Sequence, residues 1–298
     1  MNASTDPLAV LTAINLDDLV SSFGWQQRPV LAGWLRRVFH NPARKFALQM
    51  LDFDRAVGEN GLPLGAQHGL YNFVRDVRAF GCENIPAGGP VLFLSNHPGI
   101  ADTLCLFTAI ARRDLRIIAL DRPFLQSLPN VSSHLFYISD DAGERRGVVR
   151  KVAAHLRGGG AVLTFPAGEI EPDPDVYPGA LQALSGWTDS AALFVRFAPE
   201  TRIVPVLVRH VLWEKAVRHP LVWLKRSRFE RERLGAAFQL LAYMLFDVRP
   251  VTVRVQFAKP VTVAEVGSTD VAAIHAAILA RMRGLIQNPP DDAGLSLL

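Results

Sequence analysis

The segment SNHPGIAD, residues 95–102, places a histidine five residues before an aspartate, with a proline and a glycine between them. A neutral imidazole can take a proton from a hydroxyl group, and a carboxylate can orient the ring and stabilise the imidazolium. His97 and Asp102 are therefore candidates for a general base and its orienting partner. The alternative is structural: a loop histidine bonded to the backbone, and an aspartate that only caps a helix.

A second segment, LTFPAGEIEPDP at 163–174, has the composition of a tight turn after a strand. Pro166 and Gly168 favour the turn, and glycine lets backbone amides approach an anion or a developing oxyanion closely. Glu169 and Glu171 follow the turn. The alternative interpretation is an acid-rich surface loop.

The elements that position these loops are predicted from about residue 86 onward, where short apolar runs alternate with helix-like segments. The runs lie at 91–95, 115–120, 134–139, 161–165, 202–208 and 251–257. The helix-like segments lie at 101–113, 143–157, 179–188 and 213–247, with a last helix near 268–287. This pattern predicts an α/β fold with a mostly parallel layered sheet flanked by helices. Ligands of such sheets bind beyond the carboxyl ends of the strands, where both loops are expected.

The preceding part of the chain, residues 7–78, has helical periodicity throughout, starting with an Asp6–Pro7 cap. We therefore predict an N-terminal helical subdomain at 1–80, an α/β domain at 81–287 and a frayed tail at 288–298.

Composition narrows the class of protein further. Of the 298 residues, 49% are hydrophobic and 20% are charged, which argues against disorder. No apolar stretch is long enough to span a membrane, and the N-terminus does not resemble a secretory signal. Two cysteines without metal-binding spacing indicate a reducing compartment. The net charge of +4 is compatible with anionic membranes, acyl-CoA or nucleic acid.

Residues 209–234 combine eight Lys or Arg with three Glu and several aromatic and aliphatic side chains. Residues 28–40 have a similar basic and aromatic character. Both segments suit the surface of an anionic bilayer. The alternative for each is an amphipathic helix that packs on its own domain and has one solvent-exposed face. No nucleic-acid motif accompanies them, so nucleic acid is not expected as a partner.

Three blocks in order, NHPGIAD at 96–102, FPAGE at 165–169 and IVPV at 203–206, resemble the signature of the glycerolipid acyltransferase family. That family includes the 1-acylglycerol-3-phosphate and lysophospholipid acyltransferases, and its first block has the form N-H-x4-D. The resemblance covers roughly residues 80–265. The spelling of the blocks looks closest to the branch of hemolysin-like and ornithine-lipid acyltransferases.

The resemblance implies an O-acyltransferase that moves a fatty acyl group from acyl-CoA or acyl-carrier protein to a hydroxyl of a (lyso)lipid acceptor. His97 would be the general base and Asp102 its orienting partner. Because the acceptor itself attacks, neither an acyl-enzyme nor a cofactor or metal is expected, and the chain has no G-x-S-x-G elbow or H-E-x-x-H motif. The substrate-binding residues would be Asn96, Gly99, Arg122, Arg145, Arg146, Phe165, Pro166, Ala167, Gly168 and Glu169.

Two positions depart from the family pattern. Ala167 stands where the family has Glu, and Asp140 stands near the place of an Arg that holds the acceptor's phosphate. Arg145, Arg146 and Arg122 are candidates to replace that Arg. The departures favour a zwitterionic or non-phosphate acceptor, and they leave two alternative functions open: a lipid-binding protein with a degenerate site, and a thioester hydrolase. We expect a cytoplasmic protein bound peripherally to the inner face of the cell membrane.

Overall fold

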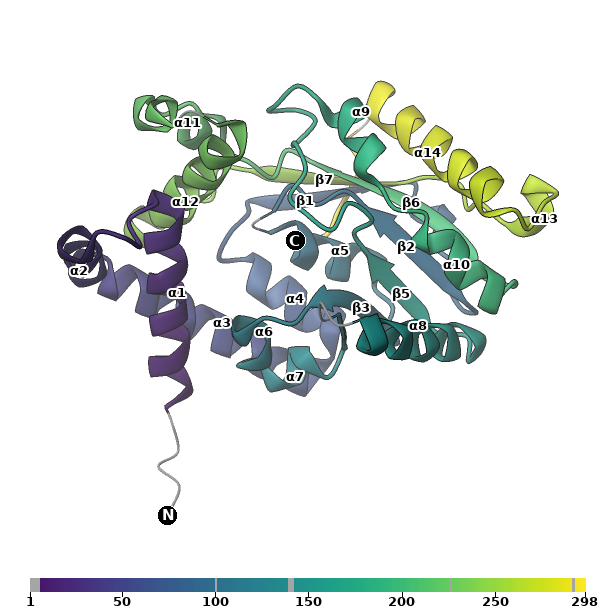
Figure 1. Cartoon of the computed structure of the whole chain (residues 1–298), viewed down its shortest axis with the longest axis horizontal. Helices are drawn as coiled ribbons and strands as arrows, with labels where there is room; N and C mark the ends of the chain where they lie inside the picture. The colour runs from purple at the N-terminus through teal and green to yellow at the C-terminus, as the bar shows by residue number, and fades with distance from the viewer. Residues whose placement is uncertain (1–5, 100, 139–141, 226, 291–292) are drawn as a thin grey trace, which may run out of the picture.

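The computed structural model describes residues 6–99, 101–138, 142–225, 227–290 and 293–298, and within them eight strands form one sheet (Figure 1). The strand order is β4-β3-β5-β2-β6-β7-β1-β8. The strands β4, β3, β5, β2 and β6 run parallel to one another, whereas β7 is antiparallel to β6 and parallel to β1. Their bounds are β1 (Asp76–Phe80), β2 (Val91–Ser95), β3 (Leu115–Leu120), β4 (Leu135–Ile138), β5 (Ala161–Thr164), β6 (Arg202–Arg209), β7 (Thr252–Phe257) and β8 (Leu295–Ser296).

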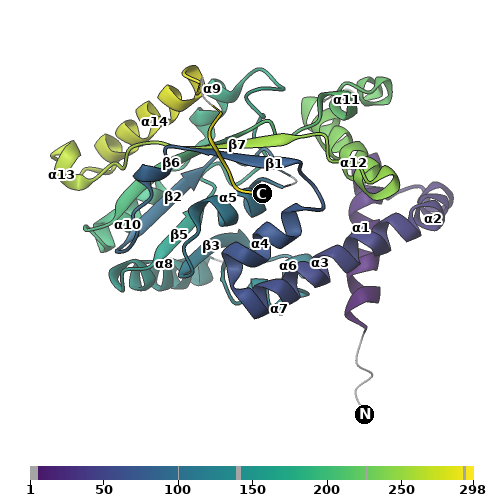
Figure 2. The same cartoon turned by 180° about the vertical axis from the view of Figure 1, so that it is seen from behind.

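Helices cover both faces of this sheet (Figure 2). The longer ones are α1 (Pro7–Phe23), α2 (Pro29–Val38), α3 (His40–Asn60), α4 (Leu62–Leu70), α5 (Asp102–Ile110), α8 (Ala142–Arg157), α10 (Ser190–Phe197), α12 (Arg228–Phe246) and α14 (Val271–Gln287). The short ones are η1 (Cys82–Asn84), α6 (Pro123–Gln126), α7 (Pro129–Ser132), α9 (Ala180–Ala183), η2 (Leu184–Gly186), α11 (Glu214–Val217), η3 (Pro220–Leu224) and α13 (Val263–Val266).

Alternation along β2 explains how the two faces are filled. Val91 and Phe93 pack into the cluster formed with α3, α4, α5 and the end of α12. Leu92 and Leu94 pack into the cluster formed with α8, α10 and α14. All four side chains are at most 1% exposed, because a parallel strand covered by helices on both sides has no solvent face. The α/β fold expected from the sequence is therefore confirmed.

Of the N-terminal helices, α3 and α4 help to cover one face of the sheet, and α1 and α2 pack against α3. Asp6 caps α1 by accepting a hydrogen bond from the Leu8 N–H at 3.1 Å, and Gly24 ends the helix with a φ of +70°. Helix α1 contacts α3 and α12, and α4 contacts α5. The segment 213–247, expected as one helix, is divided into α11, η3 and α12 because Pro220 cannot continue a helix and Ser227 starts a new one with a capping box.

The structure corrects the sequence prediction at two places near the chain ends. The helical periodicity assigned to residues 7–78 ends with α4, and β1 instead pairs in parallel with β7. Val77 and Ala79 are buried while Arg78 between them is partly exposed, an alternation that suits a strand. The tail expected to fray contributes β8, which pairs with β1 and donates the Leu297 N–H to the Val77 carbonyl at 3.0 Å. The division of the chain into domains stays a prediction.

Among the helices of the described segments, none is both long enough and apolar enough to span a membrane.

Candidate active site

His97 and Asp102 lie at the carboxyl end of β2, on the turn that leads into α5. His97 Nδ1 and Asp102 Oδ2 are 2.8 Å apart, and the Gly99 N–H donates to the same carboxylate oxygen at 2.8 Å. Gly99 has a φ of +94°, which glycine tolerates and other residues rarely adopt. The other oxygen of Asp102 accepts from the N–H and the hydroxyl of Thr103. The predicted pair is therefore a real contact, with its carboxylate satisfied on both oxygens.

The pKa values of this pair follow from burial opposed by mutual attraction. Burial lowers the pKa of His97, but the charge of Asp102, its hydrogen bond and the charge of Glu171 outweigh burial and raise that pKa above 6.5. Burial raises the pKa of Asp102, but His97 and the Gly99 and Thr103 hydrogen bonds bring it below 3.8. Asp102 is thus ionised at neutral pH, so Nδ1 of His97 must be the donor of the shared hydrogen bond.

The second ring nitrogen of His97 is available to a substrate. The side chain is 29% exposed, whereas Asp102 is 1% exposed. In the described part of the chain, no hydrogen bond is found for Nε2. Because Nδ1 carries the proton, Nε2 of the neutral ring is an acceptor, which is the state a general base requires.

The FPAGE turn follows β5, the neighbour of β2, and reaches His97 through Phe165. The two rings stack with centroids 4.4 Å apart and planes inclined by 28°. Gly168 has a φ of +68° and donates its N–H to the Phe165 carbonyl, which closes the predicted turn. Pro166 is buried and its carbonyl accepts the Thr188 N–H at 3.1 Å.

Two predicted residues of this turn lie away from the His97 ring. Ala167 packs against the apolar cluster of α8, α10 and α14. Glu169 is exposed. The structure therefore joins Phe165 to the His97 site and leaves Glu169 at the surface.

Asn96, predicted to bind substrate, is 4% exposed, and both polar atoms of its side chain form hydrogen bonds with the backbone of β6. Its Nδ2 donates to the Val208 carbonyl, and its Oδ1 accepts the Val208 N–H, both at 2.8 Å. The side-chain amide thereby continues the β2–β6 hydrogen bonding by one residue, at the point where the backbone of β2 leaves the sheet. Asn96 holds the loop that carries His97.

Glu171 follows the FPAGE turn and was not predicted to belong to the site. It is 5% exposed, and its carboxylate accepts the His97 main-chain N–H on Oε2 at 3.2 Å. Trp187 donates its indole N–H to Oε1 at 2.8 Å. Asp173, also buried, accepts the N–H groups of His210, Val211 and Leu212. The spacing of two between Glu171 and Asp173, which are both buried, was the available signal, since in extended backbone alternate residues point the same way.

The part of the chain that contains this site resembles a known protein family. Residues 76–209 match the model of the Acyltransferase family, a span that contains His97, Asp102 and the whole FPAGE turn. This part of the chain is similar to the Acyltransferase family. The resemblance found in the sequence is confirmed at this level, and the branch within the family stays a prediction.

Among solved structures, this chain is similar to the 1-acyl-sn-glycerophosphate (LPA) acyltransferase PlsC from Thermotoga maritima. The sequences are 14% identical, the alignment covers 94% of this chain and 99% of that chain, and the TM-score is 0.46. At this similarity no detail of that protein is carried over. Comparison with curated proteins finds no match.

Two of the arginines expected to hold the acceptor follow β3 and β4, at the carboxyl edge of the sheet. Arg122 follows β3 and is exposed, and Arg146 is exposed in the first turns of α8, which follows β4. Among the described residues, no contact joins either of them to His97. The side chain of Arg145 and the whole of Asp140 lie outside the described residues.

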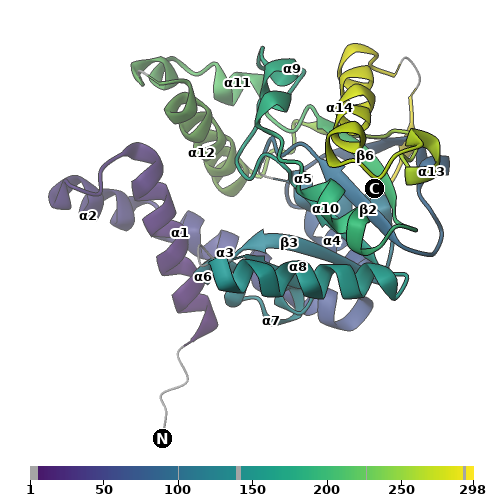
Figure 3. The ribbon, with the colours of Figure 1, turned by 45° about the vertical axis from the view of Figure 1, so that its right-hand side comes forward.

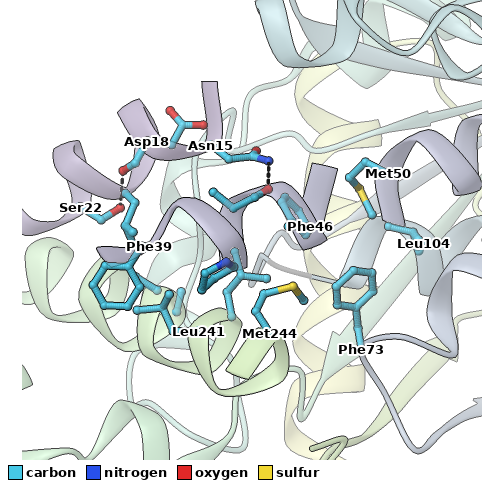
Figure 4. Close-up of a pocket in the computed structure, with 16 residues that line it drawn as sticks. Asn15, Asp18, Ser22, Phe39, Phe46, Met50, Phe73, Leu104, Leu241 and Met244 are labelled. Atoms are coloured by element: carbon cyan, nitrogen blue, oxygen red, sulfur yellow. Dashed lines mark hydrogen bonds between the residues drawn. The ribbon is translucent and has the colours of Figure 1, made fainter. Parts of the chain in front are cut away.

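An apolar cavity of about 330 Å³ lies where α1, α3, α5 and α12 meet (Figure 4). Leu104, which follows Asp102 by two residues on α5, lines one end of it, as Figure 4 shows beside Met50. Its other lining residues include Leu19, Phe39, Phe46, Phe73, Ala237, Leu240, Leu241 and Met244. Its volume is in the range of small-molecule sites, and its lining suits an alkyl chain. In the described part of the chain, no group of His, Cys, Asp and Glu side chains is arranged to hold a metal ion.

Proposed function

We propose that this protein is a lipid O-acyltransferase in which His97 is the general base, Asp102 orients it, and a thioester supplies the acyl group. The observation that carries the proposal is the 2.8 Å contact between His97 Nδ1 and the buried Asp102 carboxylate, which leaves Nε2 at the carboxyl edge of the sheet. The match of residues 76–209 to the Acyltransferase family model supports the reaction type.

In the proposed reaction, Nε2 of His97 takes the proton of an acceptor hydroxyl while that oxygen forms a bond to the thioester carbonyl carbon. The carbon–sulfur bond then breaks, and the departing thiolate takes the proton back from Nε2. Asp102 stabilises the imidazolium between these two steps. The acceptor is the nucleophile, so the proposal contains no acyl-enzyme and no cofactor beyond acyl-CoA or acyl-carrier protein as co-substrate.

The acyl chain of the donor or the acceptor would occupy the apolar cavity of Figure 4. Two facts support this placement: apart from Asn15, Asp18 and Ser22 the lining is apolar, and Leu104 at one end lies on the helix that starts with Asp102. The head group of the acceptor would lie toward Arg122 and Arg146 at the same edge of the sheet, where exposed guanidinium groups can bind an anionic group, and Arg145 stays a predicted partner. Gly99, Gly168 and Glu169 would complete the substrate contacts.

The acceptor would be reached at an anionic membrane surface, with the protein bound peripherally from the cytoplasmic side. Val30 and Trp34 on α2 are 83% and 57% exposed, and Trp223 and Leu224 on η3 are 65% and 76% exposed. Lys225 ties η3 to the end of α1 by donating to the Phe23 carbonyl at 3.0 Å, and Figures 1 and 3 place α2 and the α11–α12 segment at one end of the molecule. Arg36, Arg37 and Arg218 add positive charge, which suits anionic lipid.

The test is thiol release from palmitoyl-CoA in the presence of a panel of lysophospholipids and lyso-aminolipids. The wild type should release thiol only with an acceptor, and His97→Gln should lose at least about a hundredfold in kcat. Full activity of a folded His97→Gln variant would exclude His97 as the base. Thiol release that added acceptor does not change would indicate a hydrolase instead.

A further inference from the structure

Glu171 holds the main chain of His97 from both sides. The Glu171 N–H donates to the His97 carbonyl at 2.9 Å, and the Glu171 carboxylate accepts the His97 N–H at 3.2 Å. This reciprocal pair closes a ring of backbone and side chain around the residue after β2. Trp187, just beyond η2, fixes the carboxylate from its far side.

The local fold explains why position 171 supplies this carboxylate. The turn at Gly168 reverses the chain after β5, so that Glu169 points to solvent and Glu171, two residues later, returns to the loop after β2. Position 167, where the family pattern has Glu, is an alanine that packs on the apolar cluster. The site therefore has a second buried carboxylate that the block pattern does not predict.

Among the described residues, the charged groups that act on Glu171 are His97 and Asp102, which face it from the β2–α5 turn. Trp187 contributes a neutral donor. Burial raises the pKa of Glu171 to about 7, against the lowering effect of the Trp187 and His97 hydrogen bonds and the His97 charge. In return, the Glu171 charge is one of the causes that raise the pKa of His97.

We propose that Glu171 is a positioning residue for His97, which holds its main chain and places a second negative charge beside the imidazolium. The inference rests on the proposed function, in which His97 becomes imidazolium between proton uptake from the acceptor and proton return to the thiolate. Glu171 transfers no proton in this scheme. It acts through His97, by orienting the ring toward Asp102 and by stabilising its charged form.

The experiment compares Glu171→Gln with the wild type, with Glu200→Gln as a control at an exposed glutamate outside the site. Glutamine keeps the size of the side chain and removes the negative charge. Trp187→Phe is the second variant: it removes the indole donor, so Glu171 becomes harder to ionise while the residues that touch His97 stay unchanged. Circular dichroism and thermal melting verify that each variant folds.

The first readout is the pKa of His97, from the NMR titration of its Cε1–H in the resting protein. We expect this pKa to fall in Glu171→Gln and, by less, in Trp187→Phe, and to stay unchanged in Glu200→Gln. The second readout is the pH profile of kcat, whose acidic limb should shift to lower pH in the same order. The kcat on the plateau of Glu171→Gln should fall about tenfold, since a nearby opposite charge commonly changes proton affinity by at least that factor.

An unchanged His97 pKa in folded Glu171→Gln would overturn the inference, and so would an equal shift in Glu200→Gln. The NMR readout does not depend on turnover. A folded, fully active His97→Gln variant would therefore refute the proposed function, while a pKa shift in Glu171→Gln would still report the effect of Glu171 on His97.

Discussion

Asn96 and Val208 are joined by two hydrogen bonds of 2.8 Å, so that a side-chain amide pairs with a peptide unit of β6. The backbone of β2 ends at Ser95, and this pairing carries the sheet one residue further. His97 comes next in the chain. The position of the proposed base is thus set by the sheet through Asn96, and through Glu171 from the opposite loop.

Asn96→Ala should lower the free energy of unfolding by about 2–4 kcal/mol, because it leaves a buried N–H and a buried carbonyl of Val208 without partners. Urea unfolding measures this loss. Asn288→Ala is the matched control, since Asn288 donates to the Gly284 carbonyl at an exposed site and should cost less than about 1 kcal/mol. Equal losses in the two variants would contradict the role of Asn96.

Asp102→Asn should reduce kcat by about 10²- to 10⁴-fold while the fold persists. The amide can no longer accept from Nδ1 as an anion, and the His97 ring loses the charge that raises its pKa. The pH profile and a circular dichroism spectrum are measured together. Activity near that of the wild type, with an unshifted profile, would show that Asp102 only caps α5.

Glu171 should make the protein less stable as the pH rises from about 4.5 to about 7. Its folded pKa is raised from 4.5 to about 7, so over this window the native state binds more protons than the unfolded state, and stability falls with rising pH. His97 has the same sign: with its folded pKa raised, its contribution is present below 6.5 and is lost as the pH rises through the folded value.

Glu171→Gln should therefore lose less stability than the wild type between pH 5 and pH 8. Urea unfolding of both proteins at the two pH values gives the comparison. Groups that Glu171 does not influence cancel, and the expected fall of the His97 pKa in the variant acts in the same direction. Asp102 has the opposite sign, since its contribution is present above 3.8 and is lost as the pH falls through its lowered folded pKa, below this window. If the free energies of unfolding of the wild type and the variant differ by the same amount at pH 5 and at pH 8, the prediction is refuted.

Ala237→Leu should shift acyl preference toward shorter chains, because Ala237 lines the apolar cavity and a larger side chain takes up part of its volume. We expect kcat/KM for palmitoyl-CoA to fall about tenfold or more while kcat/KM for octanoyl-CoA changes little, as loss of room for a few methylenes is worth about 1–3 kcal/mol. Ala272→Leu, at an exposed position of α14, is the control. Equal effects on both chain lengths would place the acyl chain elsewhere.

Replacing Trp223 and Leu224 together by Ser should weaken binding to vesicles. These side chains are largely exposed on η3 and would be removed from water at a bilayer interface. Sedimentation with phosphatidylglycerol vesicles should show at least about a tenfold loss of affinity, and phosphatidylcholine vesicles should bind both forms weakly. Phe197→Ser on α10, at the far end of the molecule in Figure 1, should bind like the wild type. Binding unchanged in the double variant would exclude η3 as the contact.

Much of the layered core could be predicted from local patterns in the sequence. The apolar runs at 91–95, 161–165 and 202–208 became β2, β5 and β6, because strands buried on both faces require continuous apolar sequence. The segments expected as helices near α5, α8 and α14 were also confirmed. By contrast, β1 and β8 were missed, because each is stabilised by hydrogen bonds to distant residues, such as Arg75 to Val251 and Leu297 to Val77.

By itself, the sequence determined the α/β class and the two loops that meet at the carboxyl edge of the sheet, since strand periodicity and turn-forming glycines are local properties. It also singled out His97 and Asp102, which are close along the chain and joined by one turn. Only the tertiary structure decided that Asn96 forms hydrogen bonds with the Val208 backbone, that Glu169 is exposed and that Glu171 contacts His97. Those outcomes depend on which strands lie side by side and on which side chains are left to satisfy buried backbone groups, and no spacing along one segment encodes them.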